Sequence, residues 1–371
     1  MPTVFLHIGA PKTATSTLQR VLSRNDRQLQ KQGVLYPRSC RTGDAHHALA
    51  CDLIETHQEY VMPELWYGDI PRQASWQLLR DEIAAGGDSI EKVILSTELL
   101  FGQTHRLKRI LDEIAAQLEG LDIKVVAYLR RQDQLYSSFY NQDVKGTRQW
   151  SGTAYEFYET HQLLRNDYVS VLQSWNNAFG RGNVLVRPFE SEQWPNGSII
   201  EDFCTAIGIP ALRGTYRDQN ESIGGTQLFM KRCLNAAGFP KEQNDKILKL
   251  LEEIFPEPPA KGLLYVNKPL YRKYSSYWVK LNDILSDKYL DSKPLFQQPI
   301  PEVSEVEEHV VRTEDITTFI ENCLKTIGKG RKADYQPLFA KAILIAAIEL
   351  NMWEGLPSTT RETLQQWLGR T

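Results

Sequence analysis

Short apolar runs alternate with longer amphipathic stretches along the first 215 residues. The apolar runs are rich in β-branched residues and are bounded by glycine or proline, a pattern typical of buried strands. They predict strands at Thr3–Gly9, Gly33–Pro37, Glu91–Thr97, Ile123–Leu129 and Asn183–Arg187. Strands that alternate with helices form a parallel sheet with right-handed crossovers. The pattern therefore predicts an α/β fold with three layers, α/β/α, around a central parallel sheet.

Apolar residues at helical spacing fill most of the connections between these strands. They predict a helix that includes Leu18 and Leu22, followed by helices near Ala74–Ala85, His105–Leu118, Gln134–Val144, Tyr155–Ala178 and Ser198–Ile207. Gly208 would end the last of these as a C-cap. The stretch Arg38–Arg72 is rich in loop-forming residues, and we expect little regular structure there.

The pattern changes near Tyr216, where the strand signals stop. Helical spacing continues in five segments: Gln227–Ala237, Asn244–Ile254, Tyr277–Leu290, Glu314–Ile327 and Pro337–Leu350. We therefore expect an α/β core over residues 1–215. Residues 216–371 would form a helical C-terminal extension packed on that core, where they could complete a substrate cleft or support a homodimer.

Composition narrows the class of protein. The chain has 371 residues, of which 42% are hydrophobic and 24% charged, and its net charge is −3. These values are typical of a globular protein and give no reason to expect nucleic-acid or anionic-membrane partners. No apolar run is long enough to span a membrane, and the chain enters its first strand without a signal-type segment. We expect a cytoplasmic protein.

The five cysteines are widely spread and show neither CxxC nor Cys/His ligand spacing. A cytoplasmic chain with this pattern is expected to keep its thiols reduced and packed. We predict no metal site from these residues.

A loop rich in hydroxyl groups joins the first strand to the first helix. Lys12 lies in it, three residues after Gly9. A strand–loop–helix junction directs backbone N–H groups and a helix N-terminus at one spot, which suits a bound anion. We therefore predict an anion site formed by Gly9, Pro11, Lys12, Thr13, Ala14, Thr15, Ser16 and Thr17. An ordinary turn with a surface lysine is the alternative.

A second anion signal follows the fourth predicted strand. Arg130 ends that strand, and Ser138 follows eight residues later on the next helix. Arginine offers a planar fork that holds phosphate through two hydrogen bonds, and serine adds a neutral donor. Because ligands of parallel sheets bind beyond the carboxyl ends of the strands, we expect Arg130, Glu98 and the Lys12 loop to share one crevice. A solvated arginine in a charged turn is the alternative.

Together the two segments resemble sulfotransferases that use 3′-phosphoadenosine 5′-phosphosulfate (PAPS). In that family a strand ends in Gly-x-Pro-Lys-x-Gly-Thr-Thr/Ser, which holds the 5′-phosphosulfate. A strand-end arginine and a serine eight residues later hold the 3′-phosphate. Here Ala14 stands where the family usually has glycine. The resemblance covers about the first 215 residues, and it implies a P-loop NTPase-like sulfotransferase fold and the product 3′,5′-adenosine bisphosphate (PAP).

The implied reaction moves a sulfuryl group from PAPS to a hydroxyl or an amine. Lys12 and the loop hydroxyls would stabilise charge on the leaving oxygen. A hydroxyl acceptor also needs a general base, for which Glu98, at the end of the third strand, is the first candidate. His46 and His47 are the alternatives, since family branches differ in using glutamate or histidine. Glu98 could instead be a structural partner of Arg106.

Two other functions remain open from the sequence. One is a nucleotide kinase of related fold, although the chain lacks the Gly-Lys-Ser/Thr that places a lysine directly before the Mg²⁺-binding hydroxyl. The other is a non-catalytic protein that binds PAP or another nucleotide, which Ala14 favours.

The acceptor cannot be read from the sequence, and we expect a saccharide or another small metabolite. Basic residues that could contact an anionic acceptor are Lys145 and Arg148. Aromatic residues that could stack on a sugar or another ring are Tyr36, Trp66, Tyr67, Tyr140, Trp150 and Tyr155. Ordinary core packing is the alternative for all of these aromatics.

Overall fold

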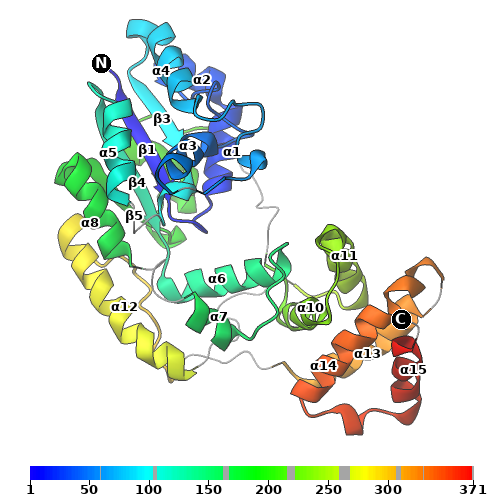
Figure 1. The fold of residues 1–371 in the computed structure, drawn as a ribbon. Coiled ribbons are helices and arrows are strands. Elements are labelled where there is room, and N and C mark those ends of the chain that lie inside the picture. Colours follow the sequence, from blue (N-terminus) through cyan, green and yellow to red (C-terminus); the bar gives the residue numbers. More distant parts are fainter. Residues whose placement is uncertain are drawn as a thin grey trace. The chain divides into compact units, whose positions relative to one another are not determined.

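The structure is a computed structural model and describes residues 1–58, 60–102, 107–161, 167–214, 222–258, 268–305, 311–328 and 330–369. It divides into two compact units (Figure 1). Unit 1 comprises Met1–Gln132, Gln162–Gln219 and Ser276–Ile300. Unit 2 comprises Asp133–His161, Asn220–Ser275 and Pro301–Thr371. Each unit thus draws on three segments, whereas the sequence suggested one continuous division at residue 215.

Unit 1 contains a parallel sheet of five strands. The strands are β1 (Thr3–Gly9), β2 (Val34–Leu35), β3 (Lys92–Ser96), β4 (Asp122–Leu129) and β5 (Val184–Pro188), in the order β2-β3-β1-β4-β5. In the centre, Leu6 of β1 is in register with Leu95 of β3 and Val125 of β4. The sheet confirms the predicted α/β class, and the strand positions match the predicted apolar runs.

Helices cover both faces of this sheet. Successive residues of a strand point to opposite faces, and Phe5, Leu6 and Ile8 of β1 are all buried. On one face, Leu18 and Phe203 pack with Phe5 in a single apolar cluster. The helices of this unit are α1 (Thr15–Arg24), α2 (Asp26–Gln30), α3 (His47–Gln58), α4 (Ser75–Gly86), α5 (Leu107–Gln117), α8 (Tyr168–Phe179) and α9 (Ile199–Ile207). Of these, α8 packs against β4 and β5 and also contacts α5 (Figure 1).

One prediction in this unit was wrong. We expected little regular structure between Arg38 and Arg72, but α3 occupies His47–Gln58. Its residues 47–54 are all buried, so polar positions do not alternate with apolar ones in the way that marks an amphipathic helix. The helix therefore lacks the sequence signal by which the others were predicted.

Unit 2 is helical. It holds α7 (Ala154–Thr160), α10 (Gly225–Ala237), α11 (Asn244–Ile254), α13 (Thr313–Ile327), α14 (Gln336–Glu349) and α15 (Ser358–Leu368). It also includes nearly all of α6 (Gln132–Lys145), while α12 (Lys268–Tyr289) contributes to both units. Phe339 and Ile343 of α14 lie in a core shared with α10, α11, α13 and α15. The predicted helical C-terminal region is thereby confirmed.

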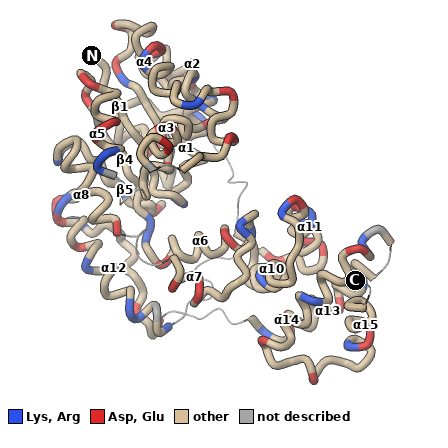
Figure 2. The backbone as a smooth tube through the Cα atoms, in the orientation of Figure 1, with Lys and Arg blue, Asp and Glu red and all other residues tan. Residues whose placement is uncertain are grey.

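Residues of both charge signs occur in each unit. Figure 2 shows basic and acidic residues interspersed through both units. Among the described residues, none of the helices combines the length and the apolar character needed to cross a membrane.

Candidate functional site

The predicted anion loop leads from the carboxyl end of β1 into α1. Its backbone takes the left-handed conformation at Lys12, with φ 67°, and at Ala14, with φ 54°. The Thr13 hydroxyl donates to the carbonyl of Ala10 at 2.5 Å, and the Ala10 N–H donates to the carbonyl of Tyr128 at 2.7 Å. These bonds fix the loop over β1 and its neighbour β4.

The N-terminus of α1 lacks a side-chain cap. Ala14 is the N-cap residue and has no side-chain oxygen that could cap the first turn, although its backbone carbonyl accepts from the Thr17 N–H at 3.0 Å. Helix N-termini leave such N–H groups unsatisfied within the helix and carry a partial positive charge. Of the hydroxyl residues in this turn, Thr15 is buried and Ser16 is exposed. An anion held by the backbone would therefore supply the acceptor that the sequence does not.

Arg130 lies against this loop. It follows β4, and its Nη1 donates to the carbonyl of Lys12 at 3.1 Å. The Arg130 guanidinium lies 5.5 Å from the ring centre of Phe189. The Tyr168 hydroxyl donates to the backbone carbonyl of Arg130 at 2.8 Å. The structure thus brings together the loop and the arginine, which are 118 residues apart.

Ser138, the predicted partner of Arg130, lies on α6 within unit 2. Arg130 belongs to unit 1. The two residues of the predicted 3′-phosphate pair are therefore divided between the units, and their pairing stays a prediction.

Glu98 also lies beside the loop. It follows β3 as the first residue of the short helix η3 (Glu98–Leu100). A side chain at Gly9 would meet the Cβ of Glu98 at 3.0 Å, so a larger residue at the end of β1 would push the two apart. Gln19 of α1 donates from Nε2 to Oε2 of Glu98 at 3.0 Å. Arg106, the alternative partner of Glu98, lies outside the described residues.

His47 contacts Thr97, the residue directly before Glu98. Its Nδ1 lies 3.0 Å from the hydroxyl of Thr97. Its ring centre lies 4.6 Å from that of Trp66, and the two ring planes are nearly perpendicular. Burial lowers the pKa of His47, and the negative charge of Glu98 partly opposes that shift. The imidazole is therefore held mainly neutral, the form that accepts a proton.

His46 has a different setting, because both of its ring nitrogens are engaged with the backbone. The Ser96 N–H donates to Nδ1 at 3.1 Å, and Nε2 donates to the carbonyl of Pro37 at 3.0 Å. Burial lowers the pKa of His46 to about 3. His46 thus joins the segment after β2 to the end of β3, and a role as base would require it to give up one of these bonds.

A buried polar row extends behind Glu98 and was not predicted from the sequence. Gln19 also donates to the Ser96 hydroxyl at 3.2 Å, and that hydroxyl lies 2.8 Å from Nδ1 of His7. His7, Gln19 and Ser96 are all buried. One sequence feature could have predicted this row. Gln19 follows Leu18 on the apolar face of the first helix, where a buried polar side chain needs a hydrogen-bond partner.

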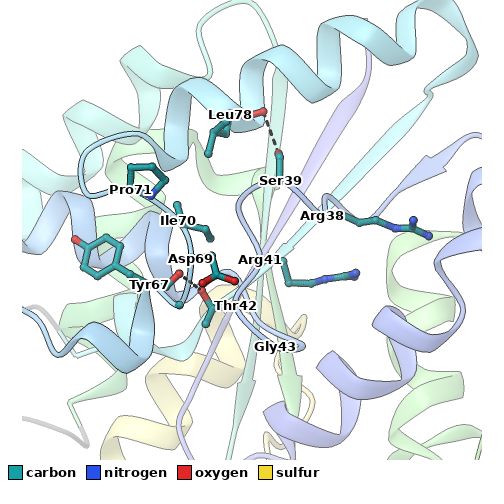
Figure 3. Close-up of a pocket in the computed structure, with 11 residues that line it drawn as sticks. Arg38, Ser39, Arg41, Thr42, Gly43, Tyr67, Asp69, Ile70, Pro71 and Leu78 are labelled. Carbon is teal, nitrogen blue, oxygen red and sulfur yellow. Dashed lines mark hydrogen bonds between the residues drawn. The ribbon is translucent and has the colours of Figure 1, made fainter.

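A pocket of about 350 Å³ lies beyond β2. It is lined by Arg38, Ser39, Arg41, Thr42, Gly43, Tyr67, Gly68, Asp69, Ile70, Pro71 and Leu78. Figure 3 shows Arg38 and Arg41 pointing away from Tyr67 and Pro71. The Ser39 hydroxyl donates to the carbonyl of Leu78 at 3.0 Å, and the Thr42 hydroxyl to that of Tyr67 at 2.9 Å.

Both arginines of this pocket pair with the buried carboxylate of Asp26. The distances are 2.8 Å from Nε of Arg38 and 3.5 Å from Nη2 of Arg41. The guanidinium of Arg41 also lies 5.1 Å from the centre of the Tyr36 ring. The two guanidinium groups therefore share one carboxylate, and the Arg38 side chain stays 53% exposed.

Several residues named for the acceptor have structural settings. Tyr36, Tyr67 and Tyr140 are at most 3% exposed, so their rings belong to the core and offer no face for stacking. Arg148 pairs with Asp143 at 2.9 Å. Tyr155, by contrast, is 46% exposed.

The five cysteines are free and buried. In the part of the chain that the structure describes, no three His, Cys, Asp or Glu residues cluster in a way that could hold a metal ion.

No family model matches the chain. An uncharacterized protein of Archaeoglobus fulgidus is 31% identical over 134 residues, which are 35% of this chain and 36% of that protein. The chain thus spans little more than a third of the length of this curated relative. A crystal structure of a sulfotransferase from Alicyclobacillus acidocaldarius aligns with this chain at 17% sequence identity and a TM-score of 0.36. The alignment covers 68% of this chain and 95% of the sulfotransferase chain. We base no conclusion on a likeness of that size.

We predict that Ala14→Gly stabilises the protein. Alanine at φ 54° and ψ 31° is sterically strained, whereas glycine adopts this conformation freely. The gain is reduced by the greater chain entropy of unfolded glycine, so we expect the free energy of unfolding to rise by about 0.5 kcal/mol. Urea unfolding checks this. Ala50→Gly, in the buried helix α3, is the control and should lose about 1 kcal/mol. Equal losses in both variants would contradict the expectation.

We also predict that unit 1 loses stability in mild acid. Burial lowers the pKa of His7 to about 4 and that of His46 to about 3. The unfolded chain takes up protons near pH 6.5, whereas the folded protein does not, so stability falls as the pH drops from about 6.5 to about 4. Thermal unfolding at a series of pH values measures this slope. His7→Gln and His46→Gln should each flatten it, and an unchanged slope in both would show that other groups control acid unfolding.

Proposed function

We propose that this chain is a PAPS-dependent sulfotransferase that transfers a sulfuryl group to a hydroxyl or amine of a small acceptor. The observation that carries the proposal is the contact of Arg130 with the Lys12 loop at the carboxyl ends of β4 and β1. Two anion-binding segments that the sequence separates by 118 residues meet at the edge where parallel sheets bind ligands. Glu98, the candidate base, reaches the same edge from β3.

The local chemistry supports an anionic donor. The uncapped N-terminus of α1, the charge of Lys12 and the hydroxyls of Thr15, Ser16 and Thr17 suit a phosphosulfate. Gly9 and Pro11 shape the approach, with Thr13 and Ala14 in the turn itself. We assign Arg130, together with Ser138, to the 3′-phosphate, because a guanidinium holds phosphate through two hydrogen bonds. The 3′-phosphate is present in PAPS and absent from ATP, so a site that binds it selects PAPS.

In the proposed reaction the acceptor oxygen attacks sulfur. A bond from sulfur to the acceptor forms while the bond from sulfur to the 5′-phosphate oxygen breaks, which releases PAP. Lys12 stabilises the charge that builds on the leaving phosphate. Glu98 takes the proton of the acceptor hydroxyl. His47, which burial holds neutral, is the alternative base.

For the acceptor we propose a saccharide or small metabolite that enters beside His47. Trp66 packs on His47, and Tyr67, the next residue, lines the pocket beyond β2. We propose this pocket for the part of the acceptor that lies away from the reacting group.

One observation favours an alternative function. Ala14 keeps a left-handed conformation that the family's glycine would adopt without strain. A protein that only binds PAP could tolerate such a change more easily than an enzyme. Calorimetry with PAP, ATP and Mg-ATP separates a PAP site from a kinase site. Release of PAP from PAPS, with p-nitrophenol and simple sugars as trial acceptors, separates an enzyme from a binder.

We predict that Lys12→Ala lowers turnover far more than it weakens PAP binding. A charge that acts on the leaving group matters most in the transition state, and such donors are worth about 100- to 1000-fold in rate. PAP release measures turnover, and calorimetry measures affinity.

Arg130→Ala is the matched control for this experiment. It should weaken PAP binding more than it weakens binding of adenosine 5′-phosphosulfate, which lacks the 3′-phosphate and would lose only the support that Arg130 gives to the Lys12 loop. A Lys12→Ala enzyme that keeps a third of wild-type turnover would refute the assignment of the loop.

We predict that Glu98→Gln keeps PAP affinity and loses turnover by about 100-fold or more, because the amide cannot accept the acceptor proton. The acidic limb of the wild-type pH–rate profile should disappear with it. His47→Ala serves as the comparison. Should Glu98→Gln stay active while His47→Ala loses turnover with PAP binding intact, His47 is the base.

A further inference from the structure

We propose that Gln19 is a positioning residue that holds the candidate base Glu98 in place from the helix that begins at the donor loop. This inference rests on the proposed sulfotransferase function. Gln19 lies on α1 and is 3% exposed. Its Nε2 lies 3.0 Å from Oε2 of Glu98 and 3.2 Å from Oγ of Ser96. The side-chain nitrogen of Gln19 thus contacts both Ser96, at the end of β3, and the carboxylate of Glu98.

The chemistry of the partners fixes the direction of the amide. An ionised carboxylate only accepts hydrogen bonds, so the NH₂ end of Gln19 must face Glu98. Its second N–H is then directed to the Ser96 hydroxyl. Because that hydroxyl accepts from Gln19, its own proton is available to the Nδ1 atom of His7, 2.8 Å away. Burial lowers the pKa of His7 to about 4, so its ring is neutral and can accept this proton.

The row leaves one oxygen of the carboxylate for chemistry. Among the described residues, the bond from Gln19 reaches Oε2 of the Glu98 carboxylate. Gln19 therefore anchors one oxygen, and the other can face an acceptor proton. The amide of glutamine does not titrate, so Gln19 cannot itself take the acceptor proton and is assigned a positioning role.

The position of Gln19 in the helix links the two halves of the site. Thr15, the first residue of α1, belongs to the proposed donor loop, and Gln19 follows four residues later on the same face. A helix is stiff over one turn, so the distance between the loop and Gln19 is fixed. The base is thus positioned relative to the donor by a single helical turn.

The first test compares two substitutions at Gln19 in the full-length protein. Gln19→Met removes both N–H donors at similar volume, and kcat should fall about tenfold while PAP affinity changes less than about twofold. Gln19→Glu places two carboxylates in contact. Since neighbouring carboxylates share a proton, the acidic limb of the pH–rate profile should move up by about one pH unit or more. The assay is PAP release from PAPS with p-nitrophenol or glucose as acceptor.

The second test is the exchange Gln19→Glu with Glu98→Gln. It restores a carboxylate–amide pair, so thermal stability at pH 7 should recover most of what Gln19→Glu alone loses. Turnover should stay as low as in Glu98→Gln, because the carboxylate is then on the wrong residue. Ser96→Ala is the matched control. It removes the other bond of Gln19 and should lower stability without moving the acidic limb.

The outcomes separate this inference from the proposed function. If the wild type neither binds PAP nor consumes PAPS, the proposed function fails, and the role of Gln19 in positioning a base fails with it. If the wild type is active and Glu98→Gln is not, an unmoved acidic limb in Gln19→Glu overturns the inference alone. An exchange variant no more stable than Gln19→Glu would show that the pair does not form in solution.

Discussion

The candidate site depends on how the chain turns from β1 into α1. Three residues of that turn, Gly9, Lys12 and Ala14, have positive φ angles. Such a turn is short enough to keep the N-terminus of α1 directly above the end of the central strand. Bonds from Ala10 and Arg130 tie the turn to β4 on one side, and contact between Gly9 and Glu98 limits it on the other. The groups proposed to bind and react with PAPS are therefore positioned by a single turn.

Burial of polar groups is the second constraint on this edge. His7, Gln19 and Ser96 lie out of water, where an unsatisfied polar group costs about 1–3 kcal/mol. Each has a partner in the row that ends at Glu98, so moving one member leaves another unsatisfied. A fixed carboxylate is what a general base requires, because proton transfer depends on hydrogen-bond distance. The same burial from which we expect acid sensitivity thus also holds the candidate base.

Local signals in the sequence predicted much of this architecture, and non-local ones were missed. β-Branched runs marked the strands, and the hydroxyl-rich segment after Gly9 marked the loop, because both signals lie within a few residues. Helix α3 was missed because its buried residues hide the helical period. Gln19 was missed because its partners are 77 and 79 residues away. The division of Arg130 and Ser138 between two units follows from contacts across three segments of each unit, which no local pattern encodes.

Ala14 shows which forces shape the loop. A left-handed alanine is unfavourable by roughly 1–2 kcal/mol, so the loop sequence alone would not select this conformation. Such strain persists where the surroundings over-determine the backbone. Here the local bond from Thr13 to Ala10 and the long-range bond from Arg130 to Lys12 hold the residues that lead into Ala14. Tertiary contacts thus impose the conformation that glycine would give freely. The loop can therefore present its N–H groups to an anion even though it departs at this position from the sulfotransferase motif that it resembles.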